Sequence, residues 1–410
     1  MRKKLMILGA GIYQIPLILK AKAMGLETLV VSIGGHYPGI PLADRFFELD
    51  TRDVEGILKL AREEAIDGIC TSGTDVAVRT IGYVCSQMGL PGISYEAAKC
   101  VTDKALMKDA FVKGGVSTAA FERIRCLDDG YVAAEKMGYP VVVKAVDSSG
   151  SRGIHKVDRP EQLENAYRDS MQVTKRDYVL VEAFIDAEEI GVDAFVGADG
   201  LEIFLPHQKF VYKTGGVTVP VGHRFPYEAD KKQIDEIERQ IALAAKAAGL
   251  KNCPLNADVF VKDDKVWIIE IGGRTGATCI PELISLYKGY DWYEKIILAA
   301  LGEAVDFASD QENPCMAKLI FSPVSGKITD IHLEKIQELE KEGVCVQLDL
   351  TVGDWADALA NGTDRTGHVI AAVNEEKTLD KYAARLRSCV ELEQGNLQEL
   401  WEEHEQKSVN

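Results

Sequence analysis

The stretch Asn256-Ala-Asp-Val-Phe-Val-Lys-Asp-Asp-Lys-Val-Trp-Ile-Ile-Glu-Ile-Gly-Gly-Arg274 decides the fold. Two runs of β-branched and aromatic residues flank the turn from Lys262 to Lys265, which is typical of a β-hairpin. Asp258 and Glu270 are equally far from residue 264, so the hairpin predicts that they lie directly opposite each other. Directly paired Cβ atoms are roughly 4.5 to 5.5 Å apart, and two like charges there are destabilising unless something compensates.

A divalent cation is the compensator that we expect for these two acids. Hard carboxylate oxygens suit Mg²⁺ or Mn²⁺ that also carries substrate phosphates. The alternative is an exposed strand face with two solvated carboxylates. The neighbouring residues in both runs are apolar and predict surroundings in which unpaired acids would be costly: Ala257, Val259, Val261, Val266, Ile269 and Ile271.

A second motif lies between Tyr139 and Ile154. The expected strand from Val141 to Lys144 delivers a lysine, and the small residues Ser148, Ser149, Gly150 and Ser151 follow with Arg152 and Gly153. Backbone N–H groups of such a loop approach polyphosphate closely, and the Lys and Arg side chains supply positive charge. The loop is not a Walker A motif, and a flexible hairpin turn beside an incidental lysine is the alternative.

A third motif runs from Tyr178 to Asp193. Its strand ends at Glu182 and leads into Ala183, Phe184 and Ile185, which offer a carboxylate and free backbone groups to the edge of a base. Glu189 follows seven residues after Glu182 and could bond vicinal hydroxyls. Acids around an edge strand are common, so this motif is informative only together with the others.

The chain before about residue 95 alternates strands and helices, which favours a parallel sheet covered by helices. Its first turn, Gly9-Ala-Gly-Ile-Tyr-Gln14, departs from the dinucleotide fingerprint at Gln14, and no acid ends the second strand near Ser32. We therefore expect a tight strand-to-helix turn and no nicotinamide cofactor. A helix-prone stretch from Tyr95 to Lys113 opens a second region, whose strands have hairpin-like separations typical of an α+β arrangement.

Composition narrows the class of partner. The chain has 47 Lys and Arg against 64 Asp and Glu, a net charge of −17, which argues against binding to nucleic acid or an anionic membrane. The nine cysteines are dispersed without a zinc-site spacing, as expected of free thiols in a reducing compartment. No signal peptide or long apolar run is present, so we expect a cytoplasmic protein.

Taken together, the motifs resemble the ATP-grasp superfamily in order and approximate spacing, over nearly the whole chain. The best match looks like the carboxylate-amine (L-amino-acid) ligases, with more distant similarity to carbamoyl-phosphate synthase, biotin carboxylase and purine-pathway enzymes. The resemblance implies a combined α/β and α+β fold with three domains. These are an N-terminal Rossmann-like pre-ATP-grasp domain (1–95), an ATP-grasp domain (96–305, lid about 115–185) and a C-terminal α+β domain (306–410).

The resemblance also implies roles for individual residues. Lys104 and Lys144 would hold the α- and β-phosphates, and the loop from Ser148 to Gly153 would close over the β- and γ-phosphates. Glu182 and the backbone of Ala183, Phe184 and Ile185 would hold adenine, and Glu189 the ribose. Asp258 and Glu270 would carry Mg²⁺ or Mn²⁺. Arg274 would face the transferred phosphoryl group, and with Lys144 it forms the catalytic pair.

One position departs from the family. Many ATP-grasp enzymes have Asn two residues after the second metal acid, where this chain has Gly272. The hairpin places Gly272 opposite Asn256, on the strand face that carries Asp258. Our hypothesis is that Asn256 reaches over Gly272 and supplies the missing amide oxygen.

The expected reaction joins a small-molecule carboxylate to an amine through an acylphosphate, at the expense of ATP. Lys209, His223 and Arg224 are candidates for a clamp on a substrate carboxylate, with a solvated loop as the alternative. Rival functions are a purine-pathway or carbamoyl-phosphate-type ligase, such as a phosphoribosylglycinamide synthetase or formyltransferase, and a non-catalytic ATP-binding module. The family resemblance favours a homodimer.

Overall fold

The computed structural model describes residues 2–148, 152–214, 217–360 and 362–408, with side chains omitted at 213–218 and 407–408. They form two compact units. The first contains Met1–Pro206, Glu228–Ala277 and Tyr293–Phe307, and the second contains His207–Tyr227, Thr278–Trp292 and Ala308–Asn410. No helix in the described ranges is long and apolar enough to cross a membrane. The predicted boundaries near residues 95 and 305 stay predictions.

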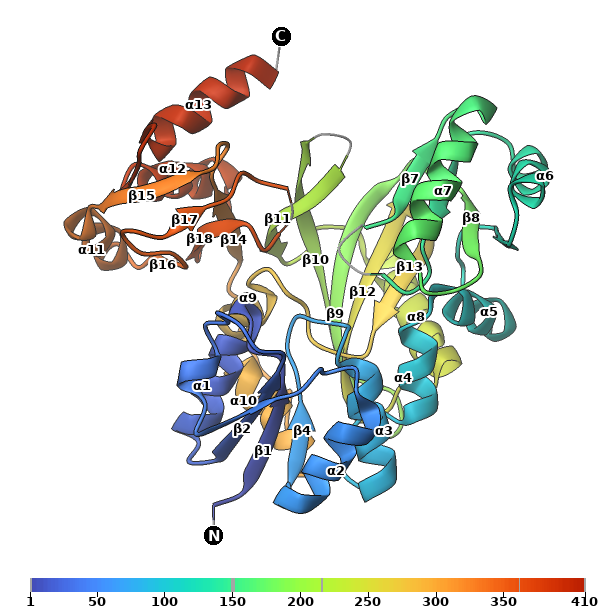
Figure 1. Cartoon of the computed structure of the whole chain (residues 1–410), viewed down its shortest axis with the longest axis horizontal. Coiled ribbons are helices and arrows are strands. Elements are labelled where there is room, and N and C mark those ends of the chain that lie inside the picture. Colours follow the sequence, from blue (N-terminus) through green and yellow to red (C-terminus); the bar gives the residue numbers. More distant parts are fainter. Residues whose placement is uncertain (1, 149–151, 215–216, 361, 409–410) are drawn as a thin grey trace. The chain divides into compact units, whose positions relative to one another are not determined.

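The first unit begins with a parallel sheet, as the alternation of strands and helices predicted. Its order is β3-β2-β1-β4, from strands β1 (Lys4–Leu8), β2 (Glu27–Ser32), β3 (Arg45–Glu48) and β4 (Gly68–Cys70). Helices α1 (Ile15–Ala23) and α10 (Trp292–Ala300) bury apolar side chains against one face, while α2 (Val54–Glu64) and α3 (Val78–Met88) lie on the other (Figure 1). Three short 3₁₀ helices are η1 (Ile12–Gln14), η2 (Ile40–Leu42) and η3 (Pro160–Gln162).

The turn after β1 is a packed turn, as predicted. The Gln14 side chain accepts a hydrogen bond from the Gly11 N–H at 2.8 Å and donates one to the carbonyl of Ser72. A Cβ at Gly9 would lie 3.0 Å from the Gln14 amide oxygen, so the side chain fills the concavity of the turn. Gln14 thus occupies the place where a dinucleotide fingerprint needs an open glycine backbone.

The expected helical stretch from Tyr95 to Lys113 is two helices, α4 (Tyr95–Val101) and α5 (Lys104–Gly114). The break has a local cause, because the Asp103 carboxylate accepts hydrogen bonds from the N–H groups of Ala105 and Leu106 and caps α5. Lys104 is therefore the first residue of a helix, and its position is fixed by that cap.

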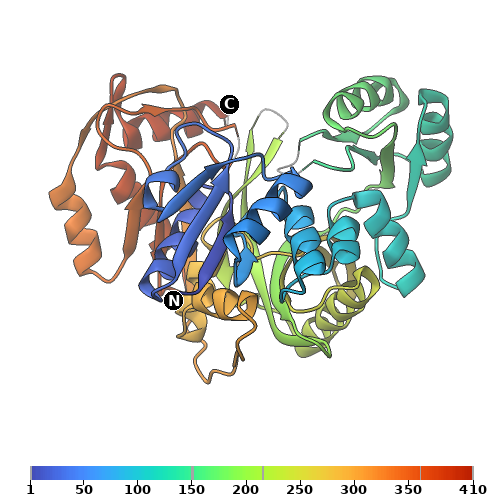
Figure 2. The same ribbon diagram turned by 60° about the horizontal axis from the view of Figure 1, so that its bottom comes forward.

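The lid region contains an antiparallel sheet of order β5-β8-β6-β7. Two helices cover one face of this sheet, as Figure 2 shows, and bury a shared apolar core. The strands are β5 (Phe121–Ile124), β6 (Val141–Lys144), β7 (Ile154–Val157) and β8 (Val179–Ala183), and the helices are α6 (Leu127–Met137) and α7 (Leu163–Val173).

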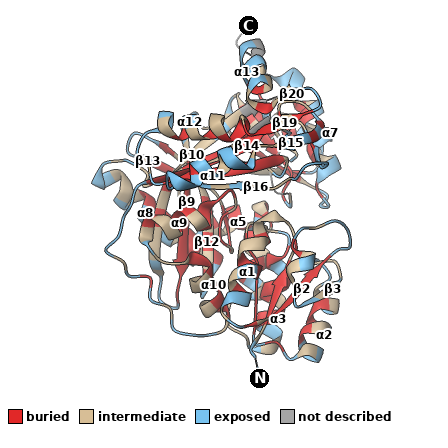
Figure 3. Cartoon of the chain, turned by 90° about the vertical axis from the view of Figure 1, so that its left-hand side faces the viewer, coloured by how far each residue is buried: buried red, intermediate tan, exposed pale blue. Residues whose placement is uncertain are grey.

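The decisive hairpin belongs to a second antiparallel array, in which β12 (Cys253–Lys262) lies between β13 (Lys265–Gly272) and β9 (Glu188–Val196). Buried and partly exposed residues alternate along β12, so one face packs in the core and the other is accessible. Helix α8 (Lys231–Ala248) contacts α5 and β13. Figure 3 shows that the strands β9 and β12 carry mostly buried residues, whereas many exposed residues lie on helices and loops.

In the second unit, antiparallel strands follow in the order β10-β11-β14-β18-β16, and a smaller sheet has the order β17-β15-β19-β20. Strand β10 begins in the first unit and enters the second at His207. Helices α9, α11, α12 and α13 accompany them, and the apolar core includes Leu379 and Leu386 of α12. The C-terminal helix is only partly exposed, because Leu397 and Trp401 are buried. The bounds are β10 (Leu201–Thr214), β11 (Val217–Phe225), α9 (Ile280–Lys288), β14 (Cys315–Phe321), β15 (Gly326–Ile331), α11 (Leu333–Lys341), β16 (Cys345–Leu348), β17 (Trp355–Ala356), β18 (Arg365–Ala371), α12 (Glu376–Arg387), β19 (Val390–Leu392), β20 (Gly395–Asn396) and α13 (Leu397–Ser408).

Candidate functional site

The two hairpin acids lie opposite each other, as the spacing predicted. Asp258 pairs with Glu270, and Asn256 pairs with Gly272. Near the turn the register is one residue different, since Val259 pairs with Ile268, and the shift falls at Ile269 as a β-bulge. If the register near the turn continued without the bulge, Asp258 would pair with Ile269 instead of Glu270. The bulge therefore brings the two carboxylates together.

The surroundings of these acids differ from the prediction. The apolar residues that alternate with them, such as Ala257 and Val259, are buried on the opposite face of the hairpin, while Asp258 and Glu270 are partly exposed. Side chains alternate between faces, so sequence neighbours do not form the acids' environment. The same face continues onto β9, because Asn256 pairs with Asp193 and Phe260 pairs with Glu189.

The accessible face borders a cavity of about 690 Å³ within the first unit. It receives side chains from both metal acids, from the start of α5 and from the loop after β4. The polar residues that line it are Arg52, Asp75, Arg79, Thr80, Tyr95, Thr102, Lys104, Asp147, Ser148, Arg152, Lys175, Arg176, Asn256, Asp258, Glu270 and Arg274. Seven of the predicted site residues thus share one cavity with Asp75, namely Lys104, Ser148, Arg152, Asn256, Asp258, Glu270 and Arg274, whereas Lys144 is not among the lining residues.

Lys104 connects the loop after β6 to the hairpin acids. Its ammonium donates to the carbonyl of Ser148 at 2.8 Å and lies 2.9 Å from a carboxylate oxygen of Glu270. Burial opposes the protonation of Lys104, but the Glu270 carboxylate outweighs burial and raises the pKa of the lysine. A cation is therefore held beside the carboxylate pair, where phosphates would approach.

Lys144 and Glu182 form a buried ion pair with a 2.9 Å separation. Lys108 joins this pair and was not predicted from the sequence. Lys108 lies 3.2 Å from the same Glu182 oxygen and donates to the Thr118 hydroxyl at 2.6 Å. Burial lowers the pKa of Lys108 to about 8, whereas Lys144 and Lys108 outweigh burial and hold the pKa of Glu182 below its ordinary value. Two lysines on one carboxylate leave a net positive charge here. Lys108 follows Lys104 by one helical turn, a spacing that could have revealed it.

The backbone segment predicted to hold adenine, Ala183 to Ile185, has only some of its hydrogen-bonding groups available. The N–H of Ala183 donates to Ala120 at 2.9 Å, and that of Phe184 donates to Pro140 at 3.3 Å. A base edge would therefore meet the N–H of Ile185 or a carbonyl of the segment. The roles of Glu182 and Glu189 toward a nucleoside stay predictions.

The phosphate loop is described only at its ends. Ser149, Gly150 and Ser151 lie outside the described residues. Ser148 donates from its hydroxyl to the carbonyl of Arg152 at 2.7 Å, which closes the loop on itself. Gly153 has a φ of +69°, and a Cβ there would lie 2.9 Å from Ala145, so a glycine is required.

Arg274 lies at the centre of a polar network. It donates to both carboxylate oxygens of Asp75, at 2.9 and 2.8 Å, and to the amide oxygen of Asn256 at 2.7 Å. The Asn256 amide nitrogen donates to Asp193 at 2.8 Å, and the other Asp193 oxygen accepts from the Gly276 N–H at 2.9 Å. Burial acts against the charge of Arg274, but Asp75 outweighs burial and raises the pKa. Neither Asp75 nor Asp193 was predicted from the sequence as a site residue.

The residue types suit Mg²⁺. Asp258 and Glu270 present opposed carboxylates, and Asn256 presents an amide oxygen on the same face, although Arg274 donates to that oxygen. Within the described ranges, no group of three or more His, Cys, Asp or Glu side chains is arranged for a metal ion. A pair of carboxylates is nonetheless typical of Mg²⁺, which usually keeps waters and shares substrate phosphates. The metal role of Asn256 stays a hypothesis.

The proposed carboxylate clamp lies in the second unit, on strands instead of the solvated loop considered as the alternative. Lys209 and His223 pair directly across β10 and β11, whereas Arg224 follows His223 and faces the other side of the sheet. His223 is buried, with its ring 4.7 Å from that of His207. Burial and the nearby His207 and Lys209 hold the pKa of His223 well below its ordinary value, which does not suit a ligand for an anion. The structure does not bring the three residues together on one face.

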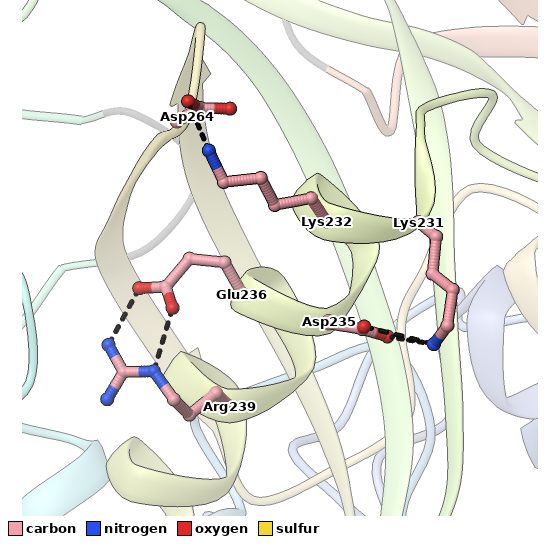
Figure 4. A pocket seen from close by; sticks show the side chains of 6 residues that line it. All are labelled: Lys231, Lys232, Asp235, Glu236, Arg239 and Asp264. Atoms are coloured by element: carbon pink, nitrogen blue, oxygen red, sulfur yellow. Dashed lines mark hydrogen bonds and ion pairs between the residues drawn. The ribbon is translucent and has the colours of Figure 1, made fainter.

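A depression on α8 and the β12–β13 turn has a different character (Figure 4). Its lining side chains form ion pairs with one another, such as Lys232 with Asp264 at 2.5 Å and Arg239 with Glu236 at 2.7 Å. These pairs are solvent-exposed and screened, so they add little stability and point to no ligand.

Comparisons with known proteins agree with this geometry. Residues 137–282 match the family described as ATP-grasp domain. The chain is 23% identical over 313 residues to formate-dependent phosphoribosylglycinamide formyltransferase of Methanocella arvoryzae, covering 73% of this chain and 72% of the relative. It is 26% identical over 330 residues to alanine–anticapsin ligase of Bacillus subtilis, covering 73% and 69%. The crystal structure of phosphoribosylglycinamide synthetase from Anaerococcus prevotii superimposes with a TM-score of 0.80 at 29% identity, covering 96% and 99%.

Proposed function

Because the chain carries an ATP-grasp domain within an ATP-grasp fold, we propose that it is an ATP-dependent carboxylate-amine ligase. Such an enzyme forms an amide or peptide bond through an acylphosphate and releases ADP and phosphate. The observation that carries the proposal is the cavity in which Lys104 and Arg274 flank the opposed carboxylates of Asp258 and Glu270. We also propose a cytoplasmic homodimer acting on small molecules.

The residues divide the work of holding ATP. Lys104 and Lys144 would neutralise phosphate charge, and the loop from Ser148 to Gly153 would cover the phosphates. Asp258 and Glu270 would hold Mg²⁺, which neutralises charge on the transferred phosphoryl group when bound. Asn256 would add an oxygen ligand only by giving up its hydrogen bond from Arg274. Glu270 would exchange part of its contact with Lys104 for that role.

The chemistry then needs alignment more than a protein nucleophile. A substrate carboxylate oxygen attacks the γ-phosphorus, the bond to the β,γ-bridging oxygen breaks, and ADP leaves with the electron pair. The amine next attacks the acyl carbon and phosphate leaves. Arg274 is held in place by Asn256 and stabilises the charge on the phosphoryl group. The lid would exclude water, which otherwise hydrolyses the acylphosphate.

A screen for ADP release tests the proposal. The full chain, ATP and Mg²⁺ are incubated with pairs drawn from a panel of amino acids, and ADP is measured by a coupled assay. We expect release that requires both a carboxylate and an amine and that falls at least about a hundredfold in Glu270→Gln, as for loss of one transition-state contact. ADP release that ignores every substrate, or an unaffected variant, would refute it.

A purine-type ligase is the second candidate, because the superposition on phosphoribosylglycinamide synthetase extends over nearly both chains. A phosphoribosylated amine, formate and bicarbonate therefore belong in the same screen. Release of ADP with these compounds and with no amino acid pair would favour the second candidate. ATP binding without turnover in any combination would leave a non-catalytic module.

A further inference from the structure

The loop after β4 places a carboxylate in the cavity that neither the phosphates nor the metal accounts for. Asp75 is part of this loop, and its side chain is 31% exposed. Its carboxylate lies beside Arg274, with both oxygens accepting from the guanidinium at 2.8 to 2.9 Å. From this placement, which rests on the proposed ligase function, we propose that Asp75 binds the ammonium group of the amine substrate.

The acids that line the cavity in the described ranges differ in their partners. They are Asp75, Asp147, Asp258 and Glu270. Asp147 accepts from the Thr174 hydroxyl at 2.7 Å and from the N–H of Lys175 at 3.1 Å. Its carboxylate therefore connects the loop after β6 to the end of α7. The hairpin pair is assigned to the metal. Asp75 is the remaining acid; it is paired with Arg274, and its side chain is still 31% exposed.

Arg274 has hydrogen-bond partners other than Asp75. A guanidinium has five N–H donors. Besides its two bonds to Asp75, Arg274 donates to the oxygen of Asn256 at 2.7 Å and to the carbonyl of Thr275 at 3.3 Å. Asn256 is itself anchored on the buried Asp193. Arg274 therefore keeps two other hydrogen-bond partners when the Asp75 carboxylate is removed.

A positively charged amine must approach a part of the cavity that carries basic side chains. Most amines carry a positive charge near neutral pH, and the acyl group that they must reach lies beside Arg274 and Lys104 in the proposed mechanism. The positive charges of Arg274 and Lys104 repel a positively charged amine. A carboxylate next to the amine makes the local interaction attractive. An ammonium bound at Asp75 would be next to the group that holds the acylphosphate. It would give up a proton, for which the Asp75 carboxylate is the acceptor, and the resulting amine would attack the nearby acyl carbon.

Position 272 lies beside the Asp75 carboxylate. A Cβ on Gly272 would lie 2.8 Å from the Asp75 oxygen that accepts from Arg274. The Asn that many family members have at this position would displace the Asp75 carboxylate. Gly272 thus leaves room for the Asp75 carboxylate beside Asp258 and Glu270.

A comparison of two nucleophiles tests the proposal. Hydroxylamine is uncharged near neutral pH and converts an acylphosphate into a coloured hydroxamate, so it reports the first half-reaction without an ammonium. Wild type, Asp75→Asn and Asp147→Asn are assayed with ATP, Mg²⁺ and each carboxylate of the amino acid panel. The nucleophile is either hydroxylamine or an amino acid amine. Asp147→Asn makes the same charge change in the same cavity.

We expect Asp75→Asn to raise the KM for the amino acid amine at least about tenfold, the cost of one hydrogen bond to a charged group, and to leave hydroxamate formation within about twofold. Asp147→Asn should affect both nucleophiles equally. Equal losses with both nucleophiles in Asp75→Asn would make Asp75 a support for Arg274, and no loss with either would remove its role; both overturn the proposal. Failure of the wild type to form any hydroxamate would instead overturn the proposed function itself, and this inference with it.

Discussion

At the scale of single residues, the buried lysine pair on Glu182 is the feature with the clearest electrostatic signature. Lys108 is 1% exposed, and its pKa falls from 10.5 to about 8 because burial disfavours its charge. A lysine whose pKa is lowered by folding binds fewer protons in the native state than in the unfolded state over that interval. Its contribution to stability therefore rises as pH increases through the window.

The prediction is that the free energy of unfolding of wild type, relative to Lys108→Met, increases from about pH 8 toward pH 10.5. Chemical denaturation at several pH values measures it, and other titrating groups cancel in the difference. Glu182→Gln serves as a control, because losing the anion should lower the pKa of Lys108 further and extend the window to lower pH. A difference that stays constant with pH would show that Lys108 is not titrating there.

Gly272 allows a second prediction at this scale. Gly272→Ala adds a Cβ within 2.8 Å of the Asp75 carboxylate, which we expect to destabilise the protein by about 1 to 3 kcal/mol, as other overpacked sites do. In an Asp75→Ala background the added methyl group has no carboxylate to displace, so the same substitution should cost much less. A double-mutant cycle by denaturation measures this coupling. Additive effects would mean that Asp75 does not crowd position 272.

At the scale of elements, the hairpin shows what the sequence could and could not predict. The turn and its flanking strands follow from residue type, and the pairing of Asp258 with Glu270 is confirmed. The prediction that residues equally far from residue 264 are paired is correct only because the bulge at Ile269 adds one residue. Local residue propensities do not predict that bulge. Polar residues brought in by other elements could not be predicted, since Asp75 meets Arg274 across 199 residues of sequence.

The cap of α5 carries a prediction for this scale. The Asp103 side chain accepts from two N–H groups of the first turn, and it also pairs with Arg176 at 3.2 Å. Asp103→Ser keeps a capping oxygen and loses the ion pair, so Asp103→Ala should be less stable than Asp103→Ser by about 1 kcal/mol. Because the cap fixes Lys104, the alanine variant should also have the higher KM for ATP. Equal KM values in the two variants would separate the cap from the phosphate site.

At the scale of the whole molecule, charge is distributed unevenly. The chain carries −17, yet the cavity is lined by seven basic and four acidic side chains in the described ranges: Arg52, Arg79, Lys104, Arg152, Lys175, Arg176 and Arg274 against Asp75, Asp147, Asp258 and Glu270. A local excess of positive charge attracts a small polyanion, while a negative surface repels a long one. The acidic composition therefore disfavours polymeric nucleic acid and is compatible with a nucleotide.

The two compact units provide the last prediction, since the residues proposed to bind the nucleotide and Mg²⁺ all belong to the first. A ligand that binds only the native state stabilises it by about 2.7 kcal/mol at a concentration of about 100 Kd. We expect ATP with Mg²⁺ to raise the melting temperature of the transition that unfolds the first unit, in differential scanning calorimetry of the full chain. In Asp258→Asn the increment that Mg²⁺ adds to nucleotide alone should disappear, because one of two metal carboxylates is lost. Asp264→Asn, an exposed acid at the hairpin turn, is the matched control and should retain that increment; its loss in both variants would place the metal effect outside the hairpin face.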